Sequence, residues 1–282
     1  MTIIQQPSVL SAYISNHKKD GKTIGFVPTM GALHEGHLSL VSEAKQQSEV
    51  TVCSIFVNPT QFNDPGDYEK YPVTLNDDIR MLENAGNNIL FLPSASTVYP
   101  DGTRSLEHYD IGYLETVLEG QYRPGHFQGV CQVMSRLLGA VNPDFLFMGR
   151  KDYQQCMVIK RLIEILEIPT EMIACPTLRE QDGLAMSSRN RRLSPDQRQK
   201  AATIYQALLK TQSGLKPGNL GNLKKEAATY LKSNGFRVDY FEITSAHDFR
   251  IVEDWDGREA LVALVAAFLG EVRLIDNMQL ND

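Results

Sequence analysis

The sequence predicts an α/β protein with a doubly wound parallel sheet and a smaller C-terminal α+β domain. Between residues 23 and 176, short β-branched or aromatic runs alternate with longer segments of helical period. That alternation is typical of a parallel sheet covered by helices. After residue 176, two helical segments precede three strand-like runs. With 42% hydrophobic and 22% charged residues over 282 positions, the chain has a globular composition and can bury a substantial core.

The parallel sheet is expected to contain five strands. The strand-like runs lie at residues 23–28, 50–57, 88–92, 144–148 and 171–175. Between them, residues 38–47, 75–85, 130–141 and 153–166 carry apolar residues three and four positions apart, so each segment can cover one face of the sheet. This arrangement is Rossmann-like, and we assign residues 1–176 to it.

Residues 177–282 predict a second domain, which would act as a lid. Helices are expected at residues 195–210 and 223–233, and strands at residues 236–244, 260–269 and 272–278. Only Gly270 and Glu271 separate the last two strands, which is the spacing of a β-hairpin. The three strands therefore predict a small antiparallel sheet.

The charge and the cysteines restrict the class of protein. A formal net charge of -6 argues against a surface that neutralises many phosphates, so no nucleic-acid partner is expected and a small-molecule substrate is favoured. The four cysteines are far apart in apolar segments and form no CxxC pair, which predicts reduced, buried thiols. No secretory pattern opens the chain and no run of 18 apolar residues occurs, so we expect a cytoplasmic protein without membrane attachment.

Polar residues follow the first predicted strand, and open parallel sheets bind ligands beyond the carboxyl ends of their strands. Gly31, His34, Gly36 and His37 lie there, before an amphipathic helix. The glycines allow close approach of the backbone to a ligand, and the N–H groups of a helix start favour an anion. On one helical face, two imidazoles could bind phosphate oxygens. A metal site or solvated histidines are the alternatives, although neither HExxH spacing nor a third ligand is present.

Three further segments carry polar residues. After the second strand, Asn58 and Gln61 could hydrogen-bond hydroxyls or a carboxylate, but such residues are also ordinary turn material. After the fourth strand, Lys151 could neutralise phosphate, while Asp152 could simply cap the next helix. Residues 186–189, Met-Ser-Ser-Arg, could clamp a phosphate between the domains, or they could be a hydrophilic linker.

These segments together resemble one family. The histidine motif and the Met-Ser-Ser-Arg segment are similar to the two signatures of the nucleotidyl-transferring α/β superfamily that includes class I aminoacyl-tRNA synthetases. Within that superfamily, PTMGALHEGHLSL, FVNPTQF, RPGHFQGV, KDYQQ and DGLAMSSRN resemble, in order and spacing, the pantoate–β-alanine ligase family across essentially the whole chain.

The resemblance implies a two-step reaction. The carboxylate of (R)-pantoate attacks the α-phosphorus of ATP to form pantoyl-adenylate and pyrophosphate, and the amine of β-alanine then displaces AMP to give pantothenate. Members of the family are homodimers and require Mg²⁺ with ATP, so the partners expected are ATP, (R)-pantoate, β-alanine and a second copy of the chain.

The resemblance also assigns residues by motif. His37, the proposed proton donor, would be catalytic together with His34 and Lys151. Gln61 and Gln155 would hold pantoate, and Gln61 would also contact β-alanine. The ATP site would be formed by Met30, Gly31, Ala32, Leu33, His34, Glu35, Gly36, His37, Gly149, Arg150, Lys151, Asp152, Leu178, Met186, Ser187, Ser188 and Arg189.

A few residues depart from the family pattern or stay unassigned. Val73 stands where arginine is usual, and Met148-Gly149-Arg150 replaces a commoner Phe-Gly-Lys or Phe-Gly-Glu. Asp77 and Asp78 are interpreted as partners of a helix dipole rather than as metal ligands. Residues 123–126, Arg-Pro-Gly-His, could form a mobile gate. The competing functions are an adenylyltransferase that acts on a phosphate, a tRNA synthetase and a noncatalytic nucleotide sensor.

Overall fold

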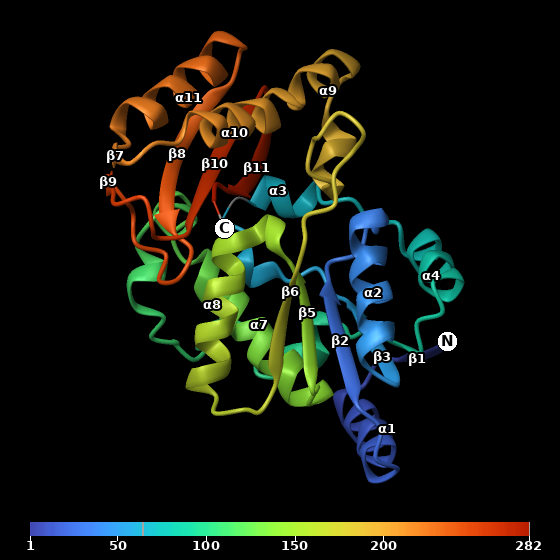
Figure 1. The fold of residues 1–282 in the computed structure, drawn as a ribbon. Helices are drawn as coiled ribbons and strands as arrows, with labels where there is room; N and C mark the ends of the chain where they lie inside the picture. The colour runs from blue at the N-terminus through green and yellow to red at the C-terminus, as the bar shows by residue number, and fades with distance from the viewer. Residues whose placement is uncertain (64, 282) are drawn as a thin grey trace. The chain divides into compact units, whose positions relative to one another are not determined.

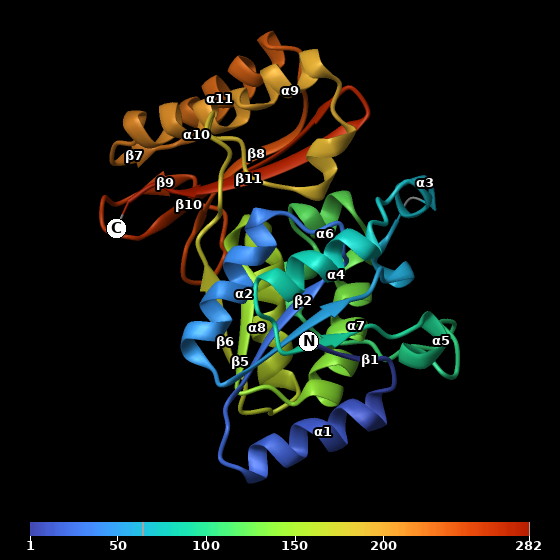
Figure 2. The ribbon, with the colours of Figure 1, turned by 90° about the vertical axis from the view of Figure 1, so that its right-hand side faces the viewer.

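The computed structural model describes residues 1–63 and 65–281, and the chain divides into two compact units. Unit 1 comprises Met1–Gly149 and Gln154–Pro176. Unit 2 comprises Arg150–Tyr153 and the chain from Thr177 onward. The short segment Arg150–Tyr153 therefore belongs to unit 2, although it lies between two elements of unit 1 in the sequence. Figures 1 and 2 show the elements of each unit.

A six-stranded sheet forms the centre of unit 1, with the strand order β1-β4-β3-β2-β5-β6. Every neighbouring pair of strands is parallel. The strands are β1 (Thr2–Ile4), β2 (Ile24–Thr29), β3 (Val50–Ile55), β4 (Ile89–Phe91), β5 (Phe145–Gly149) and β6 (Glu171–Cys175). From β2 the chain builds the sheet in one direction to β4 and then resumes on the other side of β2 with β5. The carboxyl ends of β2 and β5 are thus the point at which such sheets bind ligands.

Helices cover both faces of this sheet (Figure 1). The side chains of a strand alternate between faces, so Phe26 and Val27 of β2 enter two different core clusters. The Phe26 cluster includes residues of α1 (Pro7–Lys19), α7 (His126–Val141) and α8 (Tyr153–Ile165). The Val27 cluster includes residues of α2 (Glu35–Gln47) and α4 (Leu75–Asn84). The doubly wound prediction is confirmed.

The predicted elements form, with shifted ends. All five predicted strands are present, but β1 and α1 were not predicted. Helix α2 begins at Glu35 and α7 at His126, each before its predicted start. The shorter helical segments are η1 (Pro59–Gln61), α3 (Pro65–Glu69), α5 (Ala95–Val98), η2 (Gly112–Glu115), α6 (Glu119–Tyr122), η3 (Arg150–Asp152) and η4 (Ser188–Arg192).

Unit 2 is built on a three-stranded antiparallel sheet of order β11-β10-β8, as predicted. Its strands are β8 (Arg237–Ser245), β10 (Leu261–Leu269) and β11 (Val272–Gln279), and a two-stranded sheet pairs β7 (Gly218–Asn219) with β9 (Asp254–Trp255). The predicted hairpin turn is present, because Leu269 pairs with Val272 across Gly270. The predicted helix at residues 195–210 is two helices, α9 (Pro195–Ala201) and α10 (Thr203–Gly214), which α11 (Gly221–Ser233) follows.

The cysteine prediction is also confirmed, because all four cysteines are reduced and buried. In the part of the chain that the structure describes, no helix combines the length and the apolar character needed to cross a membrane.

Candidate functional site

The loop that leaves β2 has an unusual backbone. Gly31 has φ 79° and Ala32 has φ 49°. The left-handed region suits glycine but costs energy for alanine, so the loop needs contacts that hold it. Asp78 supplies them: its Oδ2 accepts the N–H of Ala32 at 2.9 Å, and its Oδ1 accepts the N–H of Leu33 at 2.8 Å.

Asp78 is buried, with 2% of its surface exposed. It also accepts a hydrogen bond from the Thr74 hydroxyl at 3.0 Å. A buried carboxylate with both oxygens bonded to backbone N–H groups fixes the positions of those groups. The dipole interpretation of Asp78 missed this role. By contrast, the neighbouring Asp77 is exposed and pairs only loosely with Arg80, at 3.8 Å.

His34 and His37 lie at the end of this loop. His34 is the N-cap of α2, with φ −146° and ψ 173°, so the expectation that both histidines lie on the same helical face is wrong for His34. The two rings are nevertheless adjacent, with centroids 4.1 Å apart. They meet because the cap and the third helical residue of a capping box face each other.

The capping contacts determine which ring nitrogen carries a proton. Nδ1 of His34 accepts the N–H of Gly36 at 3.1 Å, and Nδ1 of His37 accepts the N–H of His34 at 3.3 Å. A neutral imidazole that accepts at one nitrogen carries its proton on the other. Both rings therefore have an Nε2–H donor, which is the group that a phosphate oxygen accepts from.

Gln61 lies in η1, and Asn58 fixes its side chain. The Asn58 amide donates to Gln61 Oε1 at 3.2 Å and to the Gly129 carbonyl at 3.0 Å. The Tyr99 hydroxyl in turn donates to Asn58 Oδ1 at 2.8 Å. Burial raises the pKa of Tyr99, which keeps this donor protonated at neutral pH.

These contacts orient the Gln61 amide. Its oxygen accepts from Asn58, and its Nε2 lies 3.0 Å from Met30 Sδ, which is a weak acceptor. Gln61 is therefore presented as an N–H donor beside Met30. Such a group can donate to a carboxylate or hydroxyl oxygen without adding charge.

Gln155 and Gln154 are neighbours on α8 with different environments. Gln155 is half-buried. Gln154 is 3% exposed, and its amide donates to the carbonyls of Leu114 and Val117 at 2.8 and 2.9 Å. Of the two, only Gln155 retains surface for a ligand, which fits the assignment by motif.

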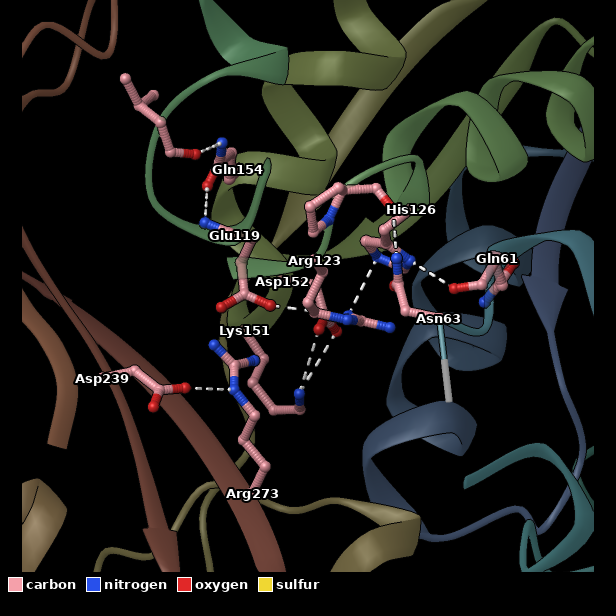
Figure 3. A network of polar contacts seen from close by, with 12 residues as sticks. Gln61, Asn63, Glu119, Arg123, His126, Lys151, Asp152, Gln154, Asp239 and Arg273 are labelled. Atoms are coloured by element: carbon pink, nitrogen blue, oxygen red, sulfur yellow. Dashed lines mark hydrogen bonds and ion pairs between the residues drawn. The ribbon is translucent and has the colours of Figure 1, made fainter. Parts of the chain in front are cut away.

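Unit 2 holds the predicted residues after β5. Lys151 Nζ lies 3.2 and 3.3 Å from the two carboxylate oxygens of Asp152 (Figure 3). Asn277 of β11 donates to the main-chain carbonyls of Arg150 and Lys151, each at 2.8 Å. The end of β11 therefore fixes the backbone from which Lys151 extends.

Unit 2 also holds Leu178 and the Met-Ser-Ser-Arg segment. Met186 donates its N–H to the Leu178 carbonyl at 3.0 Å. Ser187 caps η4 and accepts the N–H of Arg189 at 3.3 Å, and Ser188 is buried. The segment therefore has a defined turn and is not a loose linker.

An ion pair between Arg179 and the buried Asp276 joins the segment next to Leu178 to β11. Arg179 donates to the two Asp276 oxygens at 2.6 and 3.0 Å. Burial raises the pKa of the Asp276 carboxyl, and the Arg179 guanidinium opposes that shift. Asp276 and Asn277 were not predicted from the sequence, because they lie in a strand far from every motif.

The whole chain matches one family of enzymes. The sequence model of the family described as pantoate-beta-alanine ligase matches residues 2–279. The chain belongs to the pantoate–β-alanine ligase family. Among curated relatives, the pantothenate synthetase of Bacteroides thetaiotaomicron is 41% identical over 283 residues and covers 100% of both chains. The pantothenate synthetase of Cytophaga hutchinsonii is 42% identical and covers 99% of this chain and 98% of its own length.

Solved structures of pantoate–β-alanine ligases have the same fold. Pantothenate synthetase from Thermus thermophilus has a TM-score of 0.90 at 38% identity, with 100% of both chains covered. The ligase from Francisella tularensis, complexed with beta-gamma ATP and beta-alanine, has a TM-score of 0.83 at 37% identity and covers 99% of this chain and 98% of its own. The predicted fold class and the family resemblance are both confirmed.

Proposed function

We propose that the protein condenses (R)-pantoate with β-alanine in an ATP-dependent reaction that yields pantothenate, AMP and pyrophosphate through pantoyl-adenylate. The observation that carries this proposal is the match to the pantoate–β-alanine ligase family over residues 2–279. The geometry of the β2 loop supports it, because a rigid set of N–H donors at a helix start suits a nucleotide phosphate.

In the first step, a pantoate carboxylate oxygen attacks the α-phosphorus of ATP and the bond to the pyrophosphate oxygen breaks. Adenylation of this kind depends on positioning and on stabilisation of developing charge. We assign the Nε2–H groups of His34 and His37, together with Lys151, to the phosphate oxygens. His37 also supplies the proton that the family's mechanism requires.

Pantoate binding is assigned to Gln61 and Gln155. The N–H groups of Gln61 would donate to pantoate oxygens, since Asn58 occupies the amide oxygen. Neutral amides suit a carboxylate that must act as a nucleophile, because a strong ion pair would stabilise the ground state.

In the second step, the β-alanine amine attacks the acyl carbon of pantoyl-adenylate. The bond between that carbon and the bridging oxygen breaks, AMP leaves with the oxygen, and the new amide nitrogen loses a proton. Gln61 is assigned to both pantoate and β-alanine, which need to be adjacent for this attack.

The nucleotide is assigned to residues of both units. Unit 1 supplies Met30, Gly31, Ala32, Leu33, His34, Glu35, Gly36, His37 and Gly149. Unit 2 supplies Arg150, Lys151, Asp152, Leu178, Met186, Ser187, Ser188 and Arg189. The domain assignment that accompanies this proposal is an ATP- and pantoate-binding domain at residues 1–176 and a lid at residues 177–282.

Magnesium would enter with ATP. The candidate donors are imidazole, amide and backbone N–H groups, which fit phosphate oxygens, and the Asp78 oxygens are already bonded to Ala32 and Leu33. Mg²⁺ in nucleotide sites is commonly held by phosphates and waters, so this donor set fits an ion carried by the triphosphate. When bound, Mg²⁺ would neutralise charge on the phosphates.

A homodimer in the cytoplasm completes the proposal. The family resemblance supports the dimer, and the reduced, buried cysteines are consistent with a reducing compartment. Light scattering on the purified protein tests the dimer: a mass near twice 31.6 kDa is expected, and a monomer at micromolar concentration would contradict it.

Pyrophosphate exchange into ATP tests the reaction. The exchange is measured with pantoate, with pantetheine phosphate and without an acceptor. Only pantoate should support exchange, because the first step is reversible and needs the carboxylate. Exchange that ignores pantoate would refute the proposal, and exchange with pantetheine phosphate alone would favour an adenylyltransferase.

A further inference from the structure

We infer that Glu119, Arg123 and His126 form a positioning chain that holds the main chain of Gln61 in place for pantoate. The inference rests on the proposed function, since Gln61 is assigned to pantoate there. All three residues belong to unit 1, and Figure 3 shows the chain of contacts from Glu119 through Arg123 and His126 to Gln61.

The contact to Gln61 comes from the first residue of α7. His126 Nδ1 lies 2.7 Å from the Gln61 carbonyl oxygen, and the side chain is buried, with 5% exposure for the residue. A short hydrogen bond in a buried setting restrains the η1 backbone strongly. His126 therefore fixes the main chain of Gln61, from which the side chain extends.

The partners of His126 assign its tautomer. A carbonyl oxygen only accepts, so Nδ1 carries the proton that is donated to Gln61. On the other side of the ring, Arg123 Nη1 lies 3.1 Å from Nε2. A guanidinium only donates, so Nε2 accepts from Arg123. Arg123 thus keeps the ring proton on the nitrogen that faces Gln61.

Glu119 anchors the far end of the chain. Its carboxylate Oε2 lies 3.5 Å from Arg123 Nη1, and the two side chains are 9% and 24% exposed. Its main-chain N–H donates to Gln154 Oε1 at 3.0 Å. Gln154 in turn donates to two carbonyls of the preceding segment. The Arg123 guanidinium therefore pairs with the carboxylate of a residue whose main chain is held in place.

Gln61 is consequently held at two points. The positioning chain (Glu119, Arg123 and His126) fixes its carbonyl, and Asn58 fixes its amide oxygen at 3.2 Å. What remains for a ligand is the Gln61 NH₂ group. Asn63 also donates to the Pro124 carbonyl, so the segment predicted as a mobile gate is tied to the η1 region at two residues. The gate itself stays a prediction.

The experiment compares two amides at position 126 in the full-length protein. In His126→Asn, an amide N–H can take the place of Nδ1–H, whereas in His126→Gln the amide lies one carbon farther out, near the Nε2 position. We expect His126→Gln and His126→Ala to raise the pantoate KM in pyrophosphate exchange roughly tenfold, the loss of one hydrogen bond. His126→Asn should stay within about threefold of the wild type, and the ATP KM should change less than about twofold in all three.

A double-mutant cycle tests whether Arg123 acts through His126. Arg123→Ala alone should raise the pantoate KM, but in the His126→Ala background it should add almost nothing, because the shared interaction is already lost. His108→Ala, an exposed histidine of unit 1, is the matched control and should match the wild type.

The outcomes separate the inference from the proposed function. Wild-type exchange that does not depend on pantoate refutes the function itself. Pantoate-dependent wild-type exchange with an unchanged KM in His126→Gln overturns only the positioning chain. Equal losses in His126→Asn and His126→Gln, additive effects in the cycle, or an ATP KM that rises with Arg123→Ala also overturn it. If His126→Ala does not fold, the comparison of His126→Asn with His126→Gln decides.

Discussion

The two ring nitrogens of His37 have separate tasks. Nδ1 accepts the N–H of His34 and completes the cap of α2, whereas Nε2–H is the group assigned to phosphate. A substitution that preserves only the first contact can therefore separate stability from activity.

His37→Asn is that substitution, since its Oδ1 can replace Nδ1 as the cap acceptor while Nε2–H is lost. We expect a melting temperature close to that of the wild type and a kcat lower by roughly 10²- to 10³-fold, the usual effect of removing one transition-state donor. Steady-state kinetics and thermal unfolding check this. A parallel loss of melting temperature and activity would show that His37 is mainly structural.

Asp78→Asn tests the anchor of the β2 loop. An asparagine has one acceptor oxygen for the two N–H groups of Ala32 and Leu33, so one of them loses its bond and faces an NH₂ group. We expect a loss of about 1–3 kcal/mol in stability and a roughly tenfold higher ATP KM. Urea unfolding and exchange kinetics measure the two effects.

Asp77→Asn is the matched control on the same turn of α4. The Asp77 side chain is 72% exposed, so the free energy of unfolding and the ATP KM should both stay near wild-type values. Similar ATP KM values for the two variants would mean that the anchor does not shape the nucleotide loop.

The candidate ligand-binding residues could be predicted from the sequence, because they lie in motifs after strand ends. The residues that hold those motifs in position could not. His34, His37, Gln61 and Lys151 follow strand ends in the sequence, where ligand sites are expected. Asp78 is 45 positions from Leu33, and an acidic residue in the first turn of a helix has a simpler interpretation. Its true role depends on a tertiary contact that no local pattern encodes.

At the scale of elements, α7 and η1 determine the Gln61 site together. A Cβ at Gly129 would lie 2.2 Å from the Thr60 carbonyl oxygen, so the helix and the turn are in backbone contact there. This close approach allows the Gly129 carbonyl to accept from Asn58.

Gly129→Ala should therefore displace η1 from α7. We expect a destabilisation of about 1–3 kcal/mol, as for overpacked sites, and a higher pantoate KM. Gly139→Ala on the same helix is the control, because nothing lies within 4 Å of its Cβ. That control should be neutral or more stable by up to about 1 kcal/mol. Equal stability of the two variants by urea unfolding would contradict the close packing.

Element type followed from periodicity more reliably than element ends did. Strands β2 to β5 are mostly buried and rich in β-branched or aromatic residues, and they were all predicted, as was the less buried β6. The predicted starts of α2 and α7 were too late because the first turns contain His37 and His126. These side chains make polar contacts, His37 with the helix cap and His126 with Gln61, and so do not follow the apolar period of the helix. Strand β1 has only three residues and gains its stability from pairing with β4, so its own sequence carries little signal.

At the scale of the whole molecule, each unit has its own core. Each of the two core clusters of unit 1 contains a buried thiol whose pKa is raised. Cys53 lies in the cluster with α2 and α4, and Cys131 in the cluster with α1, α7 and α8. Burial raises the pKa of each thiol from 9.0 to about 12.

The raised pKa values predict slow thiol reactivity and a stability loss in alkali. At pH 8 both thiols should resist a thiol reagent in the native protein and react in urea, because the thiolate is the reactive form. A raised folded pKa contributes stability that is complete below pH 9.0 and is lost as the pH rises towards about 12. Each thiol can reduce the free energy of unfolding by up to about 1.4 kcal/mol per pH unit there. Urea midpoints across this range should fall less steeply in Cys53→Ala.

The central claim, that the carboxylate of pantoate is activated by adenylation, is tested most directly with oxygen-18. Pantoate labelled in its carboxylate is converted with ATP and β-alanine, and the released AMP is analysed by mass spectrometry. Because the attacking oxygen stays on phosphorus when the amine displaces AMP, one labelled oxygen should appear in each AMP. Unlabelled AMP, or label in inorganic phosphate alongside ADP, would contradict the account.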